Sequence, residues 1–301
     1  MILPLYNLIK KWYNILVKIK EAPSTNEWVE LWQTEEEIKM NIIIFDTETI
    51  SVDKPFCYNI GYIIYDTDGQ QVLVERDFVV EQVWHNRPLF ETAYYAHKRP
   101  LYVSSMRARQ TEMDKYGYIQ QQMIRDIKNF KVDGAYAFNC KFDDMVFDFN
   151  SDYFKCSNAL DNIPVFDIRG YACKFLMTDG YKKFLNDNAD KLGADGKSKK
   201  FITESDGYKT TAESFYCYLT GETDFDEAHT ALADSRIELE ILLACINEGA
   251  TWQTEYKVAR SYPRNRRKRF TLKVDGEVIQ QVDYIKKVER KVADGVVVSL
   301  T

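Results

Sequence analysis

Length, composition and charge place this 301-residue chain among ordinary folded proteins. Its residues are 45% hydrophobic and 14% aromatic, with 13 Gly and 7 Pro. This composition excludes a disordered, fibrous or low-complexity chain. No apolar run approaches the ~20 residues that span a bilayer, and the six cysteines form no C-x-x-C pair, which predicts reduced thiols. We therefore expect a cytoplasmic protein without a membrane partner. A viral protein in the host cytoplasm would also fit.

The net charge of −6 is unevenly distributed. Residues 251–301 contain twelve Lys or Arg and six Asp or Glu, so this segment carries +6 and the remainder −12. Residues 259–273 contain seven basic residues and no acidic one. A basic end on an acidic body predicts that the tail binds a polyanion. The alternative is a solubilising or targeting tail, because basic runs are weak motifs.

The first forty residues are expected to form a helical extension. Apolar residues from Leu5 to Ile19 recur on one helical face, and this helix should end before Pro23. A shorter helical pattern follows through Trp28 and Trp32. The polar face of the first helix is not especially basic, which favours docking onto the main domain over a membrane surface. The expected organisation is a helical extension (1–40), a main domain (41–250) and a basic extension (251–301).

The main domain begins with strand patterns. The apolar, β-branched run at 42–45 predicts a buried central strand that ends in polar residues 46–49. Two further strands are predicted at 60–66 and 71–80, joined by the turn Asp68-Gly69. The sheet should therefore open as an antiparallel meander of three strands.

Helical and strand patterns then alternate. We predict helical spacing over 106–130, a strand at 135–138, a helix from about 143, a short strand at 165–167 and helical residues to about 176. Loops with a small hairpin are expected over 186–210, and a long helix over 231–247. This order predicts an α/β fold with a mixed sheet flanked by helices. A basic hairpin over 270–282 should follow.

Three short motifs carry candidate chemistry. Asp46 and Glu48 are two apart on a strand, so both carboxylates project from one face, an arrangement that suits a divalent cation. Asp143 follows another strand, and alone it would read as a helix cap. His229 and Asp234 begin the last helix, where an imidazole and a carboxylate can face one cleft. Taken singly, an acidic pair is usually a pair of solvent-exposed charges, and a lone histidine usually has a structural role.

Together the motifs FDTET (45–49), FNCKFD (138–143) and HTALAD (229–234) resemble the DEDD superfamily of 3′-to-5′ exonucleases. The resemblance is to its histidine branch, which includes the epsilon proofreading subunit of bacterial replicative DNA polymerase and ribonuclease T. It extends over residues 41–249, and Val165–Arg169 looks like the family's short strand between the second and third motifs. It implies a ribonuclease-H-like fold.

The resemblance also implies roles for individual residues. Asp46, Glu48, Asp143 and Asp234 would coordinate two Mg²⁺ (or Mn²⁺) ions, and His229 would be the general base. Oxygen ligands suit these ions, and two ions can stabilise the attacking and leaving oxygens of an in-line displacement. An imidazole with a reference pKa of ~6.5 can accept a proton near neutral pH. The expected reaction is hydrolysis of terminal phosphodiesters of DNA or RNA, which releases nucleoside monophosphates.

The resemblance and the basic tail also suggest residues that contact the substrate. By resemblance, Thr47, Thr49 and Phe142 hold the terminal nucleotide, and Asn139 orders the site or the substrate. Relatives commonly carry glycine after the first motif, where Ile50-Ser51 stand here. The tail arginines expected to contact phosphates are Arg264, Arg266, Arg267 and Arg269.

The sequence leaves several further assignments open. The aromatic connection 84–102 offers Trp84, Tyr94, Tyr95 and Tyr102 for base stacking, although packing is the commoner role of such residues. The expected partner is a nucleic acid with a free 3′ end, in single-stranded form, and a polymerase or replication protein is a further candidate. The alternative function is a nucleic-acid or polymerase-binding accessory module in which catalysis is secondary. A nuclease that cuts internally is a third reading.

Overall fold

The computed structural model describes residues 40–258, 262, 264 and the strand residues 268–274, 277–284 and 298–300. These belong to two compact units. Unit 1 holds residues 40–188 and 210–258, and unit 2 holds residues 189–209 together with the described residues beyond 258. The helices predicted within residues 1–40 lie outside the described part of the chain.

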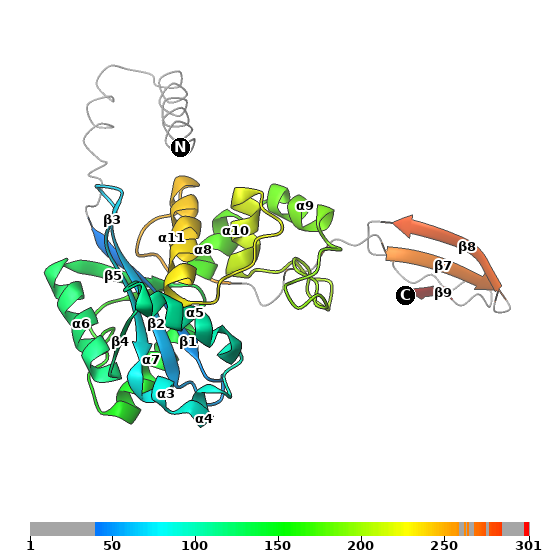
Figure 1. Cartoon of the computed structure of the whole chain (residues 1–301). Helices are drawn as coiled ribbons and strands as arrows, with labels where there is room; N and C mark the ends of the chain where they lie inside the picture. The colour runs from blue at the N-terminus through cyan, green and yellow to red at the C-terminus, as the bar shows by residue number, and fades with distance from the viewer. Residues whose placement is uncertain are drawn as a thin grey trace, which may run out of the picture. The chain divides into compact units, whose positions relative to one another are not determined.

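Unit 1 is built on a six-stranded sheet with the strand order β4-β3-β2-β1-β5-β6 (Figure 1). Its strands are β1 (Asn41–Thr49), β2 (Cys57–Asp66), β3 (Gln71–Val80), β4 (Glu112–Asp114), β5 (Val132–Ala137) and β6 (Val165–Asp167). β1, β2 and β3 pair antiparallel, whereas β5 and β6 continue the sheet parallel to β1. The predicted mixed sheet, with three antiparallel strands followed by parallel ones, is therefore confirmed.

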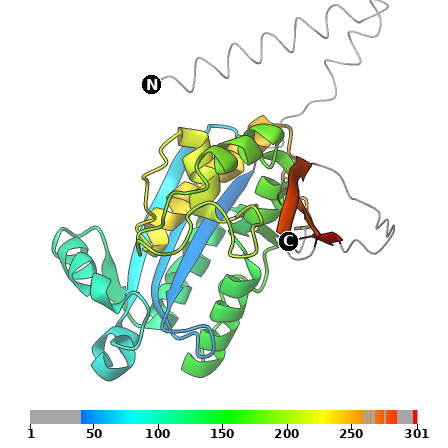
Figure 2. The ribbon, with the colours of Figure 1, turned by 90° about the vertical axis from the view of Figure 1, so that its right-hand side faces the viewer.

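Helices cover both faces of this sheet (Figures 1 and 2). α6 (Tyr116–Asn129) and α7 (Lys141–Phe154) lie on one face. α8 (Ile168–Phe175) and α11 (Ala231–Asn247) lie on the other, and α10 (Ala212–Thr220) packs on α11. The smaller helices are α3 (Glu81–His85), α4 (Arg87–Phe90), the 3₁₀ helix η1 (Ala96–Lys98), α5 (Arg99–Arg107) and α9 (Asp179–Asp187).

Alternate side chains of β1 point to opposite faces of the sheet, so some enter the core and others carry the first motif. Phe45 packs edge-on against Phe147 of α7, with ring centroids 5.5 Å apart. Because successive strand residues point to opposite faces, Asp46 and Glu48 project toward α11. Gly61 of β2 pairs with Asp46. A Cβ at Gly61 would lie 2.1 Å from the backbone nitrogen of Leu232, so this glycine lets α11 pack directly on the sheet beside the first motif.

The prediction of one helix over 106–130 is wrong in its first part. α5 ends at Arg107, and α6 begins only at Tyr116. Between them, Glu112–Asp114 pairs in parallel with the end of β3. This strand exists because a long-range partner offers hydrogen bonds, which local periodicity does not reveal. The helices α9 and α10 were also not predicted.

Unit 2 consists of the loop between α9 and α10 and the described part of the tail. Residues 189–209 contain isolated antiparallel bridges Leu192–Lys199 and Ile202–Tyr208, as expected for a small hairpin. The predicted tail hairpin is confirmed as β7 (Lys268–Val274) and β8 (Glu277–Tyr284), and β9 (Val298–Leu300) adds to β7. Across the described ranges, no helix combines the length and apolar character required to cross a bilayer.

Candidate active site

The first motif occupies the end of β1. Glu48 is 8% exposed, and Asp46 is partly buried. The hydroxyl of Tyr58 on β2 donates a hydrogen bond to Glu48 Oε2 at 3.3 Å. Both carboxylates therefore lie at the carboxyl end of a central strand, facing the helix that carries the third motif.

The second motif is tied to the first by Thr47. Asp143 lies in the first turn of α7, and its Oδ1 accepts hydrogen bonds from the Thr47 backbone N–H (3.2 Å) and the Thr47 hydroxyl (2.7 Å). The helix begins at Lys141, with Cys140 as its N-cap and no side-chain cap hydrogen bond. Asp143 is therefore not the helix cap that its position in the sequence would favour. Its side chain bridges α7 to β1.

The third motif is positioned by a buried asparagine. Asn59 of β2 is fully buried, and its Oδ1 accepts a hydrogen bond from the Ala231 backbone N–H at 2.8 Å. This contact fixes the first turn of α11. His229 precedes the helix with a φ of +48°, a left-handed conformation that is strained for a residue with a side chain. Its backbone N–H donates to the carboxylate of Asp234, one turn into the helix.

The three motifs converge in space. One potential ligand atom each from Glu48, His229 and Asp234 lies within 4.8 Å of the other two. Asp46 is close enough for the charges of Asp143, Asp234 and Glu48 to raise its pKa. The structure thus brings together all five residues that the sequence singled out as catalytic.

Burial and crowding of negative charge dominate the electrostatics. The pKa values of Asp143 and Asp234 are raised to about 7, in each case chiefly by burial. Burial also raises the pKa values of Asp46 and Glu48, and neighbouring carboxylates add to the effect. Buried carboxylates of this kind require a counter-charge. An all-oxygen donor set, in which Asp234 Oδ1 is buried without a hydrogen-bond partner, fits hard divalent cations such as Mg²⁺ or Mn²⁺.

The imidazole of His229 is neutral at pH 7. Its pKa is lowered to about 4, first by burial and then by the positive charge of Lys98. Its ring stacks on Tyr95, and its Nδ1 lies 3.9 Å from Glu227 Oε2. A neutral imidazole can accept a proton, which is the property that a general base requires.

The connection between β3 and β4 contributes residues that sequence reasoning did not assign. Lys98 Nζ donates to the Ala228 carbonyl and lies 4.6 Å from the Tyr95 ring centroid. Its charge lowers the pKa values of Glu48 and Asp234. Nothing in the local sequence marks Lys98, because its relation to the site depends on how the connection folds back onto it.

The aromatic residues of this connection have different roles. Trp84 and Tyr102 are buried, and the Trp84 ring packs edge-on against those of Phe90 and Tyr102, which confirms the packing alternative for them. Tyr95 instead contacts His229, and Tyr94 is 80% exposed. Of the four aromatic residues that the sequence offered for stacking, Tyr94 is the most exposed, and its ring meets that of Tyr95 edge-on, with centroids 4.7 Å apart.

The predicted substrate residues lie in different places. Thr49 is the last residue of β1 and follows Glu48, and Phe142 directly precedes Asp143 in α7. Asn139 has a φ of +62°, and its backbone N–H donates to Asp167 Oδ1 at 2.9 Å. Arg264 belongs to unit 2, where its Nη1 lies 3.8 Å from Asp206 Oδ1. Arg266 and Arg267 lie outside the described residues, and Arg269 is described only as part of β7.

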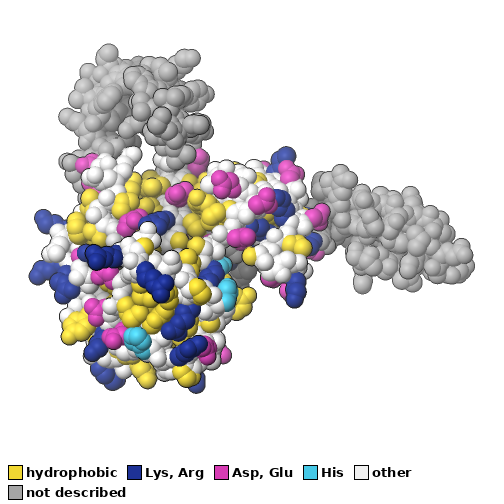
Figure 3. All heavy atoms as spheres, in the orientation of Figure 1, with side chains coloured by type: hydrophobic (Ala, Val, Ile, Leu, Met, Phe, Trp, Pro, Cys, Tyr) yellow, Lys and Arg dark blue, Asp and Glu magenta, His cyan; other side chains and the backbone are white. Residues whose placement is uncertain are grey.

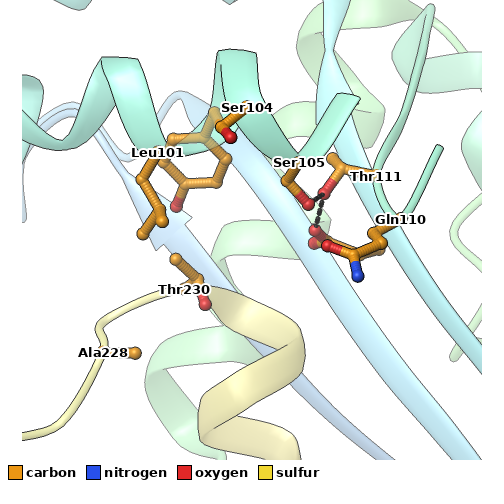
Figure 4. Close-up of a pocket in the computed structure, with 9 residues that line it drawn as sticks. Leu101, Ser104, Ser105, Gln110, Thr111, Ala228 and Thr230 are labelled. Carbon is orange, nitrogen blue, oxygen red and sulfur yellow. Dashed lines mark hydrogen bonds between the residues drawn. The ribbon is translucent and has the colours of Figure 1, made fainter. Parts of the chain in front are cut away.

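A pocket of about 270 Å³ borders the histidine loop (Figure 4). Ala228 and Thr230 line one wall, and Leu101 of α5 faces them. On the far side, the Thr111 hydroxyl lies 2.6 Å from the Ser105 hydroxyl and donates to the carboxylate of Asp77. The loop that carries His229 is therefore bordered by open space next to α5.

Comparison with known proteins finds similarity to solved structures. No family model matches the sequence, and no curated protein matches it. The fold is similar to E. coli Exonuclease I in complex with a dT13 oligonucleotide, with a TM-score of 0.42 and 15% identity over 70% of this chain and 41% of that chain. The complex of the same protein with a dA16 oligonucleotide gives a TM-score of 0.38 and 13% identity over 69% and 40% of the two chains. The match thus spans about two fifths of the length of Exonuclease I.

Proposed function

We propose that this chain is a metal-dependent 3′-to-5′ exonuclease that hydrolyses terminal phosphodiesters of DNA or RNA and releases nucleoside monophosphates. The observation that carries the proposal is the clustering of Glu48, His229 and Asp234 within 4.8 Å of one another. Asp46 and Asp143 adjoin this cluster. An isolated acidic pair or a lone histidine has many explanations, but this combination at the carboxyl edge of such a sheet has few.

Four carboxylates, from Asp46, Glu48, Asp143 and Asp234, would hold two Mg²⁺ or Mn²⁺ ions. When bound, such ions neutralise the charge that develops on the attacking and leaving oxygens at phosphorus. The chain's own residues perform the remaining tasks. Thr47 orients Asp143 through two hydrogen bonds, and Tyr58 orients Glu48 through one.

His229 would accept the proton of the attacking water. Its neutral form at pH 7 leaves a lone pair for that proton. The stacked Tyr95 ring restricts the rotation of the imidazole and thereby directs it to the carboxylates. The histidine is thus positioned before substrate arrives.

Electrostatics on the surface are compatible with a polyanionic substrate. On the face drawn in Figure 3, Lys and Arg side chains are spread over the part of unit 1 that holds α3, α5 and α6. Lys98 lies next to the carboxylates and would contact a phosphate there. The basic tail supplies further positive charge in the sequence. The substrate proposed is a single strand with a free 3′ end.

The decisive experiment is a time course on 5′-labelled single-stranded DNA and RNA of equal sequence, with Mg²⁺, Mn²⁺ or a chelator. A metal-dependent ladder that shortens from the 3′ end, and that is largely lost in His229→Ala, is expected. Circular single strands should be resistant, because they have no end to digest. Cleavage of circles would instead favour an internal nuclease. No cleavage of either polymer, together with a cellular role retained by Asp46→Ala, would favour the accessory binding module.

A further inference from the structure

A fifth carboxylate, Glu238, lies at the same edge of the sheet. It is one helical turn beyond Asp234 on α11, so the two side chains share a face of the helix. Glu238 is 3% exposed, and its carboxylate accepts a hydrogen bond from the backbone N–H of Phe138. Phe138 directly follows β5, the strand beside β1. The Glu238 carboxylate therefore lies where β5 and β1 end, beside the first motif.

One oxygen of this side chain has no partner. Among the described residues, the only buried carboxylate oxygens without a hydrogen-bond partner are Asp234 Oδ1 and Glu238 Oε2. Both belong to the same face of α11. An unpaired buried carboxylate oxygen is unfavourable, because the water that it loses on burial is not replaced. A positively charged ligand between the two side chains would remove this penalty for both.

Other buried carboxylates in the chain show how such groups are normally satisfied. Asp126, which is 4% exposed, accepts hydrogen bonds from the Tyr62 hydroxyl at 2.8 Å and from Gln122 at 2.9 Å, and it pairs with Arg76 at 3.4 Å. This site is saturated by donors from its own chain. Glu238 has one backbone donor only, so its surroundings are not those of a structural carboxylate.

We propose that Glu238 is a fifth carboxylate of the metal centre and binds a divalent cation on the side of Asp46 and Asp143. The inference rests on the proposed function for the existence of that centre. The charges of such a centre would balance. Five carboxylates carry −5, and two divalent cations together with the neighbouring Lys98 carry +5. The group proposed as ligand is a hard, oxygen-preferring cation, for which a further anionic oxygen increases affinity.

The test is Mn²⁺ binding to the full chain, measured by electron paramagnetic resonance of free Mn²⁺ without substrate. Glu238→Gln keeps the shape of the side chain and an acceptor for the Phe138 N–H, but removes the charge. We expect at least about tenfold weaker Mn²⁺ binding, or the loss of one of two sites. Glu240→Gln is the matched control on the same helix, because Glu240 is exposed, and it should bind Mn²⁺ as the unmodified chain does.

A thermal melt in chelator separates this role from a structural one. Glu238→Gln should melt at a higher temperature than the unmodified chain without metal, since a buried negative charge is lost. A lower melting temperature with unchanged Mn²⁺ binding would assign Glu238 to folding alone and overturn the inference. If Glu238→Gln does not fold, Glu238→Met, which is apolar and of similar volume, is measured instead.

The outcomes distinguish the inference from the function on which it rests. If the unmodified chain binds Mn²⁺ and digests single strands, and Glu238→Gln binds Mn²⁺ equally well, the inference is wrong and the proposed function stands. If the unmodified chain neither binds Mn²⁺ nor digests either polymer, both are wrong. Weaker binding in Glu238→Gln but not in Glu240→Gln supports the inference, and digestion of single strands by the unmodified chain supports the function.

Discussion

The imidazole of His229 lies face to face with the ring of Tyr95, with centroids 4.4 Å apart and planes inclined by 17°. The two residues come from loops that are far apart in the sequence, one between β3 and β4 and one before α11. His229 also has a left-handed backbone conformation, at a φ of +48°. Stacking therefore holds a side chain whose own backbone is strained, as expected where a functional group must be aimed.

Removal of this stacking should impair turnover more than binding. Tyr95→Ala is expected to lower kcat about tenfold or more with little change in KM, because a freely rotating imidazole is less often in position to accept the proton. Tyr95→Phe keeps the ring and should retain most of the activity. Steady-state kinetics on single-stranded oligonucleotides would measure this. Equal losses in the two variants would show that the hydroxyl, and not the stacking, is required.

The metal-free protein should become less stable as the pH rises from about 4 to 7. The pKa values of Asp143 and Asp234 are about 7 in the folded chain, above the ~4 of an unfolded carboxyl, so the folded state binds more protons in this interval. His229 acts in the opposite direction, because its folded pKa of about 4 lies below the ~6.5 of the unfolded state. The carboxyls outnumber it, and burial also raises the pKa values of Asp46 and Glu48.

Urea unfolding in chelator at several pH values would measure this dependence. The free energy of unfolding should be higher at pH 5 than at pH 8, and Mn²⁺ should restore much of the loss at pH 8. Asp143→Asn, which removes one titrating group, should flatten the profile. A metal-free protein that is more stable at pH 8 than at pH 5 would contradict the electrostatic account of the site.

Asn59 should contribute strongly to stability. Its Nδ2 donates to Asp77 Oδ1 (2.7 Å) and to the Phe78 carbonyl (2.9 Å), and its Oδ1 accepts from Tyr102 (3.1 Å) and from Ala231. Asn59→Ala would leave these buried groups unpaired and should lower the free energy of unfolding by about 3 kcal/mol. Lys183→Ala, which removes an exposed hydrogen bond to Asp187, is the control and should change it by less than about 1 kcal/mol. Similar effects of the two changes would show that the buried network is not important.

Thr47→Val tests the connection between the first two motifs. The change keeps the backbone hydrogen bond to Asp143 Oδ1 and removes the one from the hydroxyl at 2.7 Å. Because that hydroxyl lowers the pKa of Asp143, its loss should raise this pKa further and weaken Mn²⁺ binding by about tenfold. Isothermal titration with Mn²⁺ would measure the change, with Thr49→Val as the control two residues along. Unchanged binding in Thr47→Val would show that Asp143 does not depend on this contact.

The tail arginines should contribute affinity without sequence preference. If Arg266 and Arg267 contact phosphates, their replacement by alanine should weaken binding to single strands and reduce the slope of log affinity against log salt by about 0.7 for each lost contact. Fluorescence anisotropy across a salt series would show this, and a metal-free buffer prevents digestion during the measurement. An unchanged salt slope would favour the solubilising or targeting tail.

The sequence alone determined the elements whose signals are local. Local residue patterns specify the four-residue apolar run of β1 as a strand, the turn at Asp68-Gly69 as a hairpin and residues 231–247 as a long helix. The order of the three motifs predicted which carboxylates would meet at the edge of the sheet. Each of these predictions depends on spacing along the chain, which the sequence contains in full.

Only the tertiary structure decided which other side chains join the site. β4 forms because the end of β3 provides hydrogen bonds from outside its local segment. Tyr95 and Lys98 reach His229 through the folding of a connection without marked periodicity, and Asn59 is important because α11 packs on β2. Glu238 looks like one more charge on a helix until its burial against the end of β5 is known. Burial and long-range contacts set the energy of each of these groups, and both depend on the packed fold.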